Sequence, residues 1–468
     1  MNKYKRLLSN TAILGMGTFA SKVLVFLLMP LYTAILSAEE FGLADLVAQT
    51  ANLLIPLAAV GICDGLFRFT LDTEEADRKK VFTASMMVLS IGSAVLALIA
   101  FGVYCLGQSG AEFLPMIVAY VVCANFHSAV AHYLRAKGHT TLFAAQGVAN
   151  TVLTIVLNIL FLVVWKMGSM GYVLSVVVAD LLITIGLMFI GRVWRDFSFR
   201  AWDGKVARAL LKFSLPYIPT TMMWLVTSVA DRYIVTIYCG TAIHGLYTAA
   251  SKIPTLVLLV SGVFIEAWHV SSVKESPEER SSFFGTVYRN YMSLMFIGAS
   301  ALIACAKIFT KLLLADSYYS SWEYVPILVV AMVFAALSSF FGSVYFLEKK
   351  SMFSMLTAMA GAIINVILNF LLIPRHGAIG AAVATLISYV MTYAIRSFDT
   401  VRYVRFSQYY VRVAINTVLL LAQACIMIAE PQYWQYAQIG IVLVVLLING
   451  RGILGTARQI FSKKSKKI

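Results

Sequence analysis

The chain has 468 residues, of which 60% are hydrophobic and only 13% are charged, and its net charge is +15. Soluble proteins carry about 25% charged residues, so this chain cannot cover a water-facing surface, and lipid is the solvent that suits it. A membrane span takes about 20 apolar residues. The many long apolar segments therefore leave only short loops, which excludes a soluble catalytic domain.

Fourteen apolar segments follow one another along the chain, and all are predicted to be helices because lipid offers no partner for an unpaired backbone group. The first follows a basic N-terminus but continues to about Leu36. That is too long for a cleaved signal peptide, so we expect a retained span. The predicted spans are 10–36, 43–67, 81–106, 113–135, 142–165, 169–191, 209–238, 246–272, 283–306, 322–347, 351–373, 376–399, 409–429 and 433–449.

Lysine and arginine are concentrated in the two termini and the even-numbered loops, whereas the odd-numbered loops hold only Lys166, Lys307, Lys311 and Arg375. Cytoplasmic loops retain basic residues. The pattern therefore predicts a multi-pass protein of the bacterial cytoplasmic membrane with both termini in the cytoplasm. Its basic loops and tail then meet anionic lipid headgroups, which argues against nucleic acid as a partner.

Four short motifs recur in the same order about six spans apart, which indicates an internal duplication. The pairs are Tyr133–Lys137 with Tyr345–Lys349, Val156–Asn158 with Ile367–Asn369, Gly168–Gly171 with Gly377–Gly380, and Phe41–Leu43 with His244–Leu246. An even number of spans per repeat gives both halves the same orientation.

We therefore predict an all-α polytopic membrane protein with two six-helix lobes related by a pseudo-twofold axis. The N-lobe covers 1–208, the C-lobe covers 209–400, and two extra helices with a basic tail cover 401–468. Such lobes are expected to enclose a central cavity that opens to each side of the membrane in turn.

Few ionisable residues are expected at membrane depth, where they are costly and normally face a bundle interior or a water-filled cavity. Lys22 in the first span and Lys252 in the eighth are expected to face the cavity, and Arg232 is a candidate contact for an anion. The deep carboxylates are candidates for ion coupling or structural pairing, with an interface position as the simpler interpretation for the first two. They are Asp45, Asp64, Asp180, Asp231 and Glu266.

The spans that carry most of this charge also carry prolines, each of which removes a helix hydrogen bond and permits bending. Membrane helices also simply tolerate proline, so hinges are one of two interpretations. The residues are Pro30, Pro56, Pro216, Pro219 and Pro254.

Three other patterns predict no chemistry. The GxGxxG match at Gly450–Gly455 follows a membrane span rather than a strand, so it is not a dinucleotide site. His127 and His132 lack an HExxH context and are expected to hydrogen-bond at a helix interface or lie near its end rather than bind zinc. The six cysteines form no CxxC motif and are expected to be small buried apolar residues. We therefore expect no catalytic residue, metal or cofactor.

Several segments together resemble one family across nearly the whole chain. They are 10–46, Phe213–Pro216, Asp231–Ile234, Gly245–Tyr247 and Asn369–Gly380. These resemble the Wzx-type flippases of the polysaccharide exporter family, whose superfamily also holds the MATE antiporters and the lipid II flippase MurJ. Members move an undecaprenyl-pyrophosphate-linked oligosaccharide from the cytoplasmic to the outer leaflet, so the resemblance implies a transporter and not an enzyme.

The resemblance also implies a role for the deep cations, because related flippases place basic residues in spans one and eight, as Lys22 and Lys252 are here. With Arg232 they are expected to bind phosphate oxygens by charge-assisted hydrogen bonds. Na⁺ or H⁺ is a candidate coupling ion, and a polymerase and glycosyltransferases of the same pathway are candidate partners. Four aromatic residues are candidates for stacking on sugar rings, although anchoring at the membrane interface is the simpler interpretation for each: Trp224, Tyr233, Tyr247 and Trp268.

Three alternatives stay open. A lipid II flippase would be close in mechanism. A MATE-type cation antiporter should have an acidic and aromatic cavity, which Lys22 and Lys252 argue against. An integral-membrane polysaccharide polymerase or ligase generally needs a large external loop, and the external loops here are short.

Overall fold

The computed structural model of the protein describes residues 26–465 apart from positions 27, 76, 108–109, 216, 275–276 and 349. Across that part of the chain the structure is helical and contains no β-strand. The contacts divide it into two compact units, Met1–Val229 and Ala230–Ile468. The predicted all-α membrane fold is confirmed at this level.

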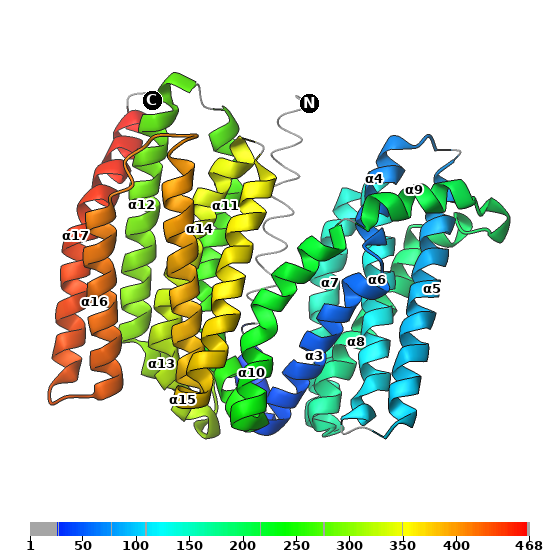
Figure 1. The fold of residues 1–468 in the computed structure, drawn as a ribbon, viewed down its shortest axis with the longest axis horizontal. Coiled ribbons are helices and arrows are strands. Elements are labelled where there is room, and N and C mark those ends of the chain that lie inside the picture. Colours follow the sequence, from blue (N-terminus) through cyan, green and yellow to red (C-terminus); the bar gives the residue numbers. More distant parts are fainter. Residues whose placement is uncertain are drawn as a thin grey trace. The chain divides into compact units, whose positions relative to one another are not determined.

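The first unit is built from antiparallel helices joined by short turns (Figure 1). Ser37 starts α3 with a capping box, because its side chain accepts from the backbone N–H of Glu40 while the Glu40 carboxylate accepts from Ser37. The helices are α2 (Met29–Ile35), α3 (Ala38–Ala58), α4 (Ile62–Asp72), α5 (Arg78–Cys105), α6 (Leu114–Ala136), α7 (Thr140–Asn158) with its π-helical extension Ile159–Val164, α8 (Gly168–Ile190) and α9 (Gly204–Ser214).

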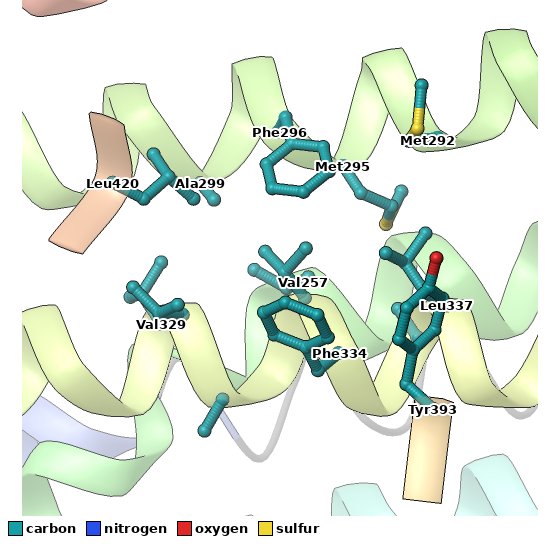
Figure 2. Close-up of a cluster of buried hydrophobic side chains, with 14 of the residues drawn as sticks. Val257, Met292, Met295, Phe296, Ala299, Val329, Phe334, Leu337, Tyr393 and Leu420 are labelled. Atoms are coloured by element: carbon teal, nitrogen blue, oxygen red, sulfur yellow. The ribbon is translucent and has the colours of Figure 1, made fainter. Parts of the chain in front are cut away.

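The helix α10 (Tyr217–Lys252) leads into the second unit, whose core is rich in aromatic residues. Figure 2 shows Met295 and Phe296 of α12 packed toward Phe334 and Leu337 of α14. The remaining helices are α11 (Thr255–Lys274), α12 (Pro277–Ala304), α13 (Ala306–Leu313), the 3₁₀ segment η5 (Asp316–Tyr324), α14 (Val325–Leu347), α15 (Ser351–Thr400), α16 (Tyr410–Ala429) and α17 (Trp434–Ser465).

Two long helices fold back on themselves at a glycine. In α15 the break is at Gly377, whose φ of 59° favours glycine because a side chain would be strained there. Asn365 donates a hydrogen bond to Ser388 Oγ across the break (3.5 Å), so the two arms of α15 run antiparallel. The arms correspond to the predicted spans 351–373 and 376–399.

The same device occurs in α10 at Gly240, where φ is 86°. The hydroxyl of Tyr247 donates to Asp231 Oδ2 across this break at 3.1 Å. Residues on the two sides of Gly240 therefore lie side by side, as expected if spans seven and eight meet there.

By length and composition, eight described helices can cross a membrane, or up to ten when each bent pair counts as one span. The number is below fourteen for identifiable reasons. Most of the first predicted span lies outside the described residues, the segment Met352–Thr400 contains two predicted spans, and Trp434–Gly450 is apolar but short. The bent pair that includes α10 is counted only from Val229, so it leaves the predicted span 209–238 uncounted.

Two prolines lie at or near breaks in their spans, as expected. Pro56 lies near the end of α3, and the chain then turns through Val60 and Gly61, both with positive φ, before α4 begins. Pro254 lies between α10 and α11, which together form a pair bent by 42°. At these two places the chain bends near a residue that lacks a backbone donor.

The predicted boundary between loop 192–208 and span seven is wrong. Residues Gly204–Ser214 instead form the amphipathic helix α9, which packs on α4 and α5 through Ala207 and Leu210.

The GxGxxG match lies inside α17, so its backbone is helical and forms no phosphate-binding turn.

Candidate functional site

A buried polar cluster joins three helices of the first unit. His127 of α6 faces Asp180 of α8, with 2.9 Å between Nδ1 and Oδ1. Its other ring nitrogen lies 2.7 Å from Oε1 of Gln146 on α7, and Asn150 of the same helix donates to Asp180 Oδ1 at 2.9 Å. Asp180 is only 6% exposed, so its carboxylate is buried in the helix bundle, where it contacts His127 and Asn150.

The contacts of His127 limit where a proton can lie. An amide oxygen only accepts, so with Gln146 oriented as it is here the Nε2 atom of His127 carries the hydrogen. The 2.9 Å contact to Asp180 then needs one further proton, either on Nδ1 or on the carboxylate. The pair can therefore hold one exchangeable proton between its two groups.

A second buried carboxylate of the same unit comes from α3. Asp45 is 7% exposed, and its Oδ1 accepts from Gln49 one turn later at 3.2 Å. Tyr120 of α6 lies within electrostatic range of both Asp45 and Asp180. Two of the five predicted carboxylates, Asp45 and Asp180, are thus buried in the first unit, and Tyr120 lies near both.

Asp64 differs from these two carboxylates. It lies in the first turn of α4 and is exposed, so it is at the surface of its unit rather than in the buried cluster.

In the second unit Asp231 accepts hydrogen bonds from the backbone N–H of Arg232 (2.9 Å) and from the Tyr247 hydroxyl (3.1 Å). Asp231 is thus hydrogen-bonded within the hairpin that α10 forms around Gly240.

A separate cluster of amide and hydroxyl side chains lies between the two arms of α15. There Asn369 donates to Asn365 at 2.9 Å, and Asn365 donates to Ser388.

The predicted cations have different positions. Lys22 lies outside the described residues, as does the side chain of Glu266. Lys252 is the last residue of α10, directly before the bend at Pro254, and both it and Arg232 are partly exposed. Lys252 thus lies at a break in its span rather than within a continuous helix.

Two of the aromatic residues predicted for sugar stacking are core residues instead. Trp268 is 3% exposed; its ring stacks on Phe340, and its indole N–H donates to Ser343 at 2.7 Å. Tyr247 is also 3% exposed. Neither ring leaves a face open for a sugar, so for these two the expectation was wrong. Tyr233 is partly exposed, and the side chain of Trp224 lies outside the described residues.

The internal repeat of the sequence is matched by a repeated contact. Tyr133, at the end of α6, donates to Asp196 Oδ2 at 3.0 Å in the first unit. Tyr345, its counterpart at the end of α14, donates to Asp399 Oδ2 at 2.6 Å in the second. Asp196 follows the end of α8, and Asp399 lies near the end of α15. The same tyrosine–aspartate hydrogen bond therefore occurs at corresponding places in the two repeats.

Two residues with several buried partners, His127 and an arginine, did not stand out in the sequence. Hydrogen bonding of His127 at a helix interface is confirmed, but no spacing along one helix indicates that its partner is Asp180. Arg396 is 6% exposed and donates to Thr357 and to the carbonyl oxygens of Ser338 and Ser354. Among the described residues, no three His, Cys, Asp or Glu side chains gather into a metal site.

Residues 7–269, more than half of the chain, match the family described as "Polysaccharide biosynthesis protein". The chain belongs to this family. No curated protein matches the chain closely enough to add to this. The predicted membership of the polysaccharide exporter group is thereby confirmed.

Solved structures share the fold of this family member at low sequence identity. "Lipid II flippase MurJ, inward closed conformation" matches with a TM-score of 0.70 and 15% identity over 94% of this chain and 98% of that chain. An inward-facing MATE family multidrug transporter of the MOP superfamily matches with a TM-score of 0.64 and 14% identity over 81% and 94%. A MOP superfamily transporter from Pyrococcus furiosus Vc1, described as having a binding pocket of reversed polarity, gives 0.55 and 13% over 84% and 95%.

Proposed function

We propose that the protein is a flippase that moves an undecaprenyl-pyrophosphate-linked oligosaccharide from the inner to the outer leaflet of the cytoplasmic membrane by alternating access. The observation that carries the proposal is the match of residues 7–269 to the polysaccharide biosynthesis family. The likeness in fold to a lipid II flippase supports it, because that protein is also named for moving a lipid-linked cargo.

The cargo has a pyrophosphate head, a sugar chain and a long hydrocarbon tail. In this proposal the head follows a hydrated path past Lys22, Arg232 and Lys252 while the tail stays in lipid. Lysine and arginine suit phosphate because their N–H groups form charge-assisted hydrogen bonds to its oxygens. The partly exposed positions of Arg232 and Lys252 are compatible with this role.

We further propose that the buried carboxylates couple transport to an ion. Asp180 with His127 is the strongest candidate, because this buried pair can hold one proton between its two groups. Asp45 lies in the same unit and Asp231 has hydrogen bonds that could stabilise its charge. Exposed Asp64 is the weakest of the four candidates.

The membrane orientation belongs to the same proposal. Both termini and the even-numbered loops lie in the cytoplasm, and the lobes cover 1–208 and 209–400, with 401–468 outside the repeat. Glycosyltransferases that build the oligosaccharide and a polymerase that consumes it are the expected partners. Membrane lipids surround the whole assembly.

The test is complementation of a deletion strain that accumulates inward-facing lipid-linked oligosaccharide. We expect Lys22→Ala to abolish complementation at normal expression and Lys22→Arg to be milder, because arginine keeps the positive charge. Lys166→Ala removes an exposed lysine at the turn before α8 and serves as the matched control. Full complementation by both Lys22 variants would make that residue structural.

Other outcomes would favour the alternatives. Accumulation of inward-facing lipid II in the deletion strain would assign the cargo to peptidoglycan synthesis. Resistance to cationic drugs that depends on the protein would favour a MATE-type antiporter.

A further inference from the structure

The segment between α8 and α10 forms a structured surface rather than a loose loop. Its inward residues fix it to the first unit: Val193 is fully buried, and Asp196 accepts from Tyr133 (3.0 Å) and Lys137 (2.8 Å). The backbone N–H of Ser198 donates to Thr83 Oγ1 of α5 at 3.2 Å. The side chains that point outward therefore have a defined direction.

The outward side chains alternate between cations and large aromatic rings. Phe199 is 72% exposed, Trp194 is 50% exposed, and the guanidinium of Arg195 lies 5.0 Å from the centroid of the Trp194 ring. The exposed basic and aromatic residues of this segment, called here the linker surface, are Arg192, Trp194, Arg195, Phe199, Arg200, Trp202, Lys205, Arg208 and Lys212.

The helix α9 continues this surface in a regular way. Lys205, Arg208 and Lys212 are three and four residues apart, so they lie on one face of the helix. The opposite face buries Ala207 and Leu210 against the hydrophobic core of the first unit. An apolar face turned toward the bundle leaves the basic stripe turned away from it.

Within the described part of the chain, no carboxylate forms an ion pair with any of the six cations of the linker surface. The two acidic residues of the segment are already engaged. Asp196 pairs with Lys137, and Asp203 caps α9 by accepting from the backbone N–H of Lys205 at 2.8 Å. The linker surface therefore keeps its positive charge for a partner.

We propose that the linker surface docks on the anionic headgroups of the lipid leaflet on its own side of the membrane. Two observations choose lipid over a soluble partner. The end of α8 that leads into it is strongly exposed at Phe189 (69%) and Ile190 (71%), so the linker aromatics continue a lipid-facing surface. Aromatic rings interleaved with lysine and arginine also suit the boundary between headgroups and acyl chains.

The test is hydrogen–deuterium exchange of the full-length protein in nanodiscs. One preparation contains only phosphatidylcholine, and the other contains phosphatidylglycerol as well. We expect the amides of 192–203 to exchange more slowly with the anionic lipid, and the difference to disappear at high salt because salt screens exposed charges.

The charge stripe is tested by combining Lys205→Gln, Arg208→Gln and Lys212→Gln, which should abolish most of the difference between the two nanodiscs. The matched control combines Lys166→Gln, Lys311→Gln and Arg375→Gln, which removes as many exposed cations from elsewhere. It should keep the difference.

Equal exchange of the wild-type segment in both nanodiscs would overturn the proposal and would direct attention to a soluble acidic partner. A difference that survives the triple substitution on α9 would also overturn it. Neither result depends on which cargo is flipped, so the two proposals can fail separately.

Discussion

The pair formed by His127 and Asp180 makes a prediction at the scale of single residues. An imidazole titrates near neutral pH, which favours a proton over Na⁺ as the coupling ion proposed for this site. We expect Asp180→Asn and His127→Gln each to remove acceleration of flipping by an imposed proton gradient, because both keep hydrogen-bonding groups but lose the titrating one. The measurement is transport in proteoliposomes at clamped membrane potential.

The control for this prediction is Asp64→Asn. Its carboxylate is exposed and outside the buried cluster, so coupling should be unchanged. A sodium gradient that drives flipping equally well in wild type and Asp180→Asn would contradict the assignment of the coupling site. Asp180→Ala is less informative, because removing one partner of a buried ion pair costs about 3–5 kcal/mol of stability.

A buried polar residue could be recognised from the sequence when its own position was unusual, but not when its role depended on partners from other helices. Asp180 stood out because a carboxylate in the middle of an apolar span is costly. His127 did not, because its partners lie on two other helices and no one-helix periodicity connects them. Asp64 was placed in a span by an apolar run that in fact breaks at Gly61 into a new helix.

Close helix packing gives a prediction at the scale of elements. A Cβ added to Gly92 of α5 would overlap the carbonyl oxygen of Ala58 at the end of α3, whereas one added to Gly102 of the same helix meets nothing within 4 Å. We expect Gly92→Ala to lower stability by about 1–3 kcal/mol, as overpacking does. Gly102→Ala should leave the melting temperature unchanged or raise it, because alanine favours the helix.

The measurement is the melting temperature of detergent-purified protein, followed by fluorescence-detected size exclusion after heating. Equal melting temperatures for the two glycine variants would show that α3 and α5 separate without cost. Hydropathy could not locate breaks such as the one after Ala58, because it shows where the chain is apolar but not where a helix ends and the chain changes direction.

The elements themselves were predicted well where hydropathy and helix length agree. The segments corresponding to α5, α6, α7 and α8 fall within a few residues of the predicted spans. The amphipathic α9 was missed because its apolar face is narrow and merges with the run that starts α10. The antiparallel arms of α15 were separated correctly, since Gly377 and the polar residues beside it interrupt the apolar run.

At the scale of the whole molecule, the membrane potential should act on the proposed anionic cargo. The cytoplasm is negative, so outward movement of an anionic head is favoured by about 2.3 kcal/mol per charge per 100 mV. That corresponds to about a 50-fold change in the equilibrium distribution per charge. We expect flipping in vesicles to slow when the potential is clamped at zero, and unchanged rates would remove electrophoretic drive.

Uncharged side chains supply part of the attachment of the last two helices to the rest of the second unit. Asn416 of α16 and Asn449 of α17 exchange hydrogen bonds of 3.3 and 2.7 Å, and Gln423 bonds twice to Ser300 of α12. Carboxamides neither gain nor lose a proton between acid and alkaline conditions, and ions in the medium screen them little. This part of the attachment should therefore be unaffected by the protonation changes proposed for the buried carboxylates.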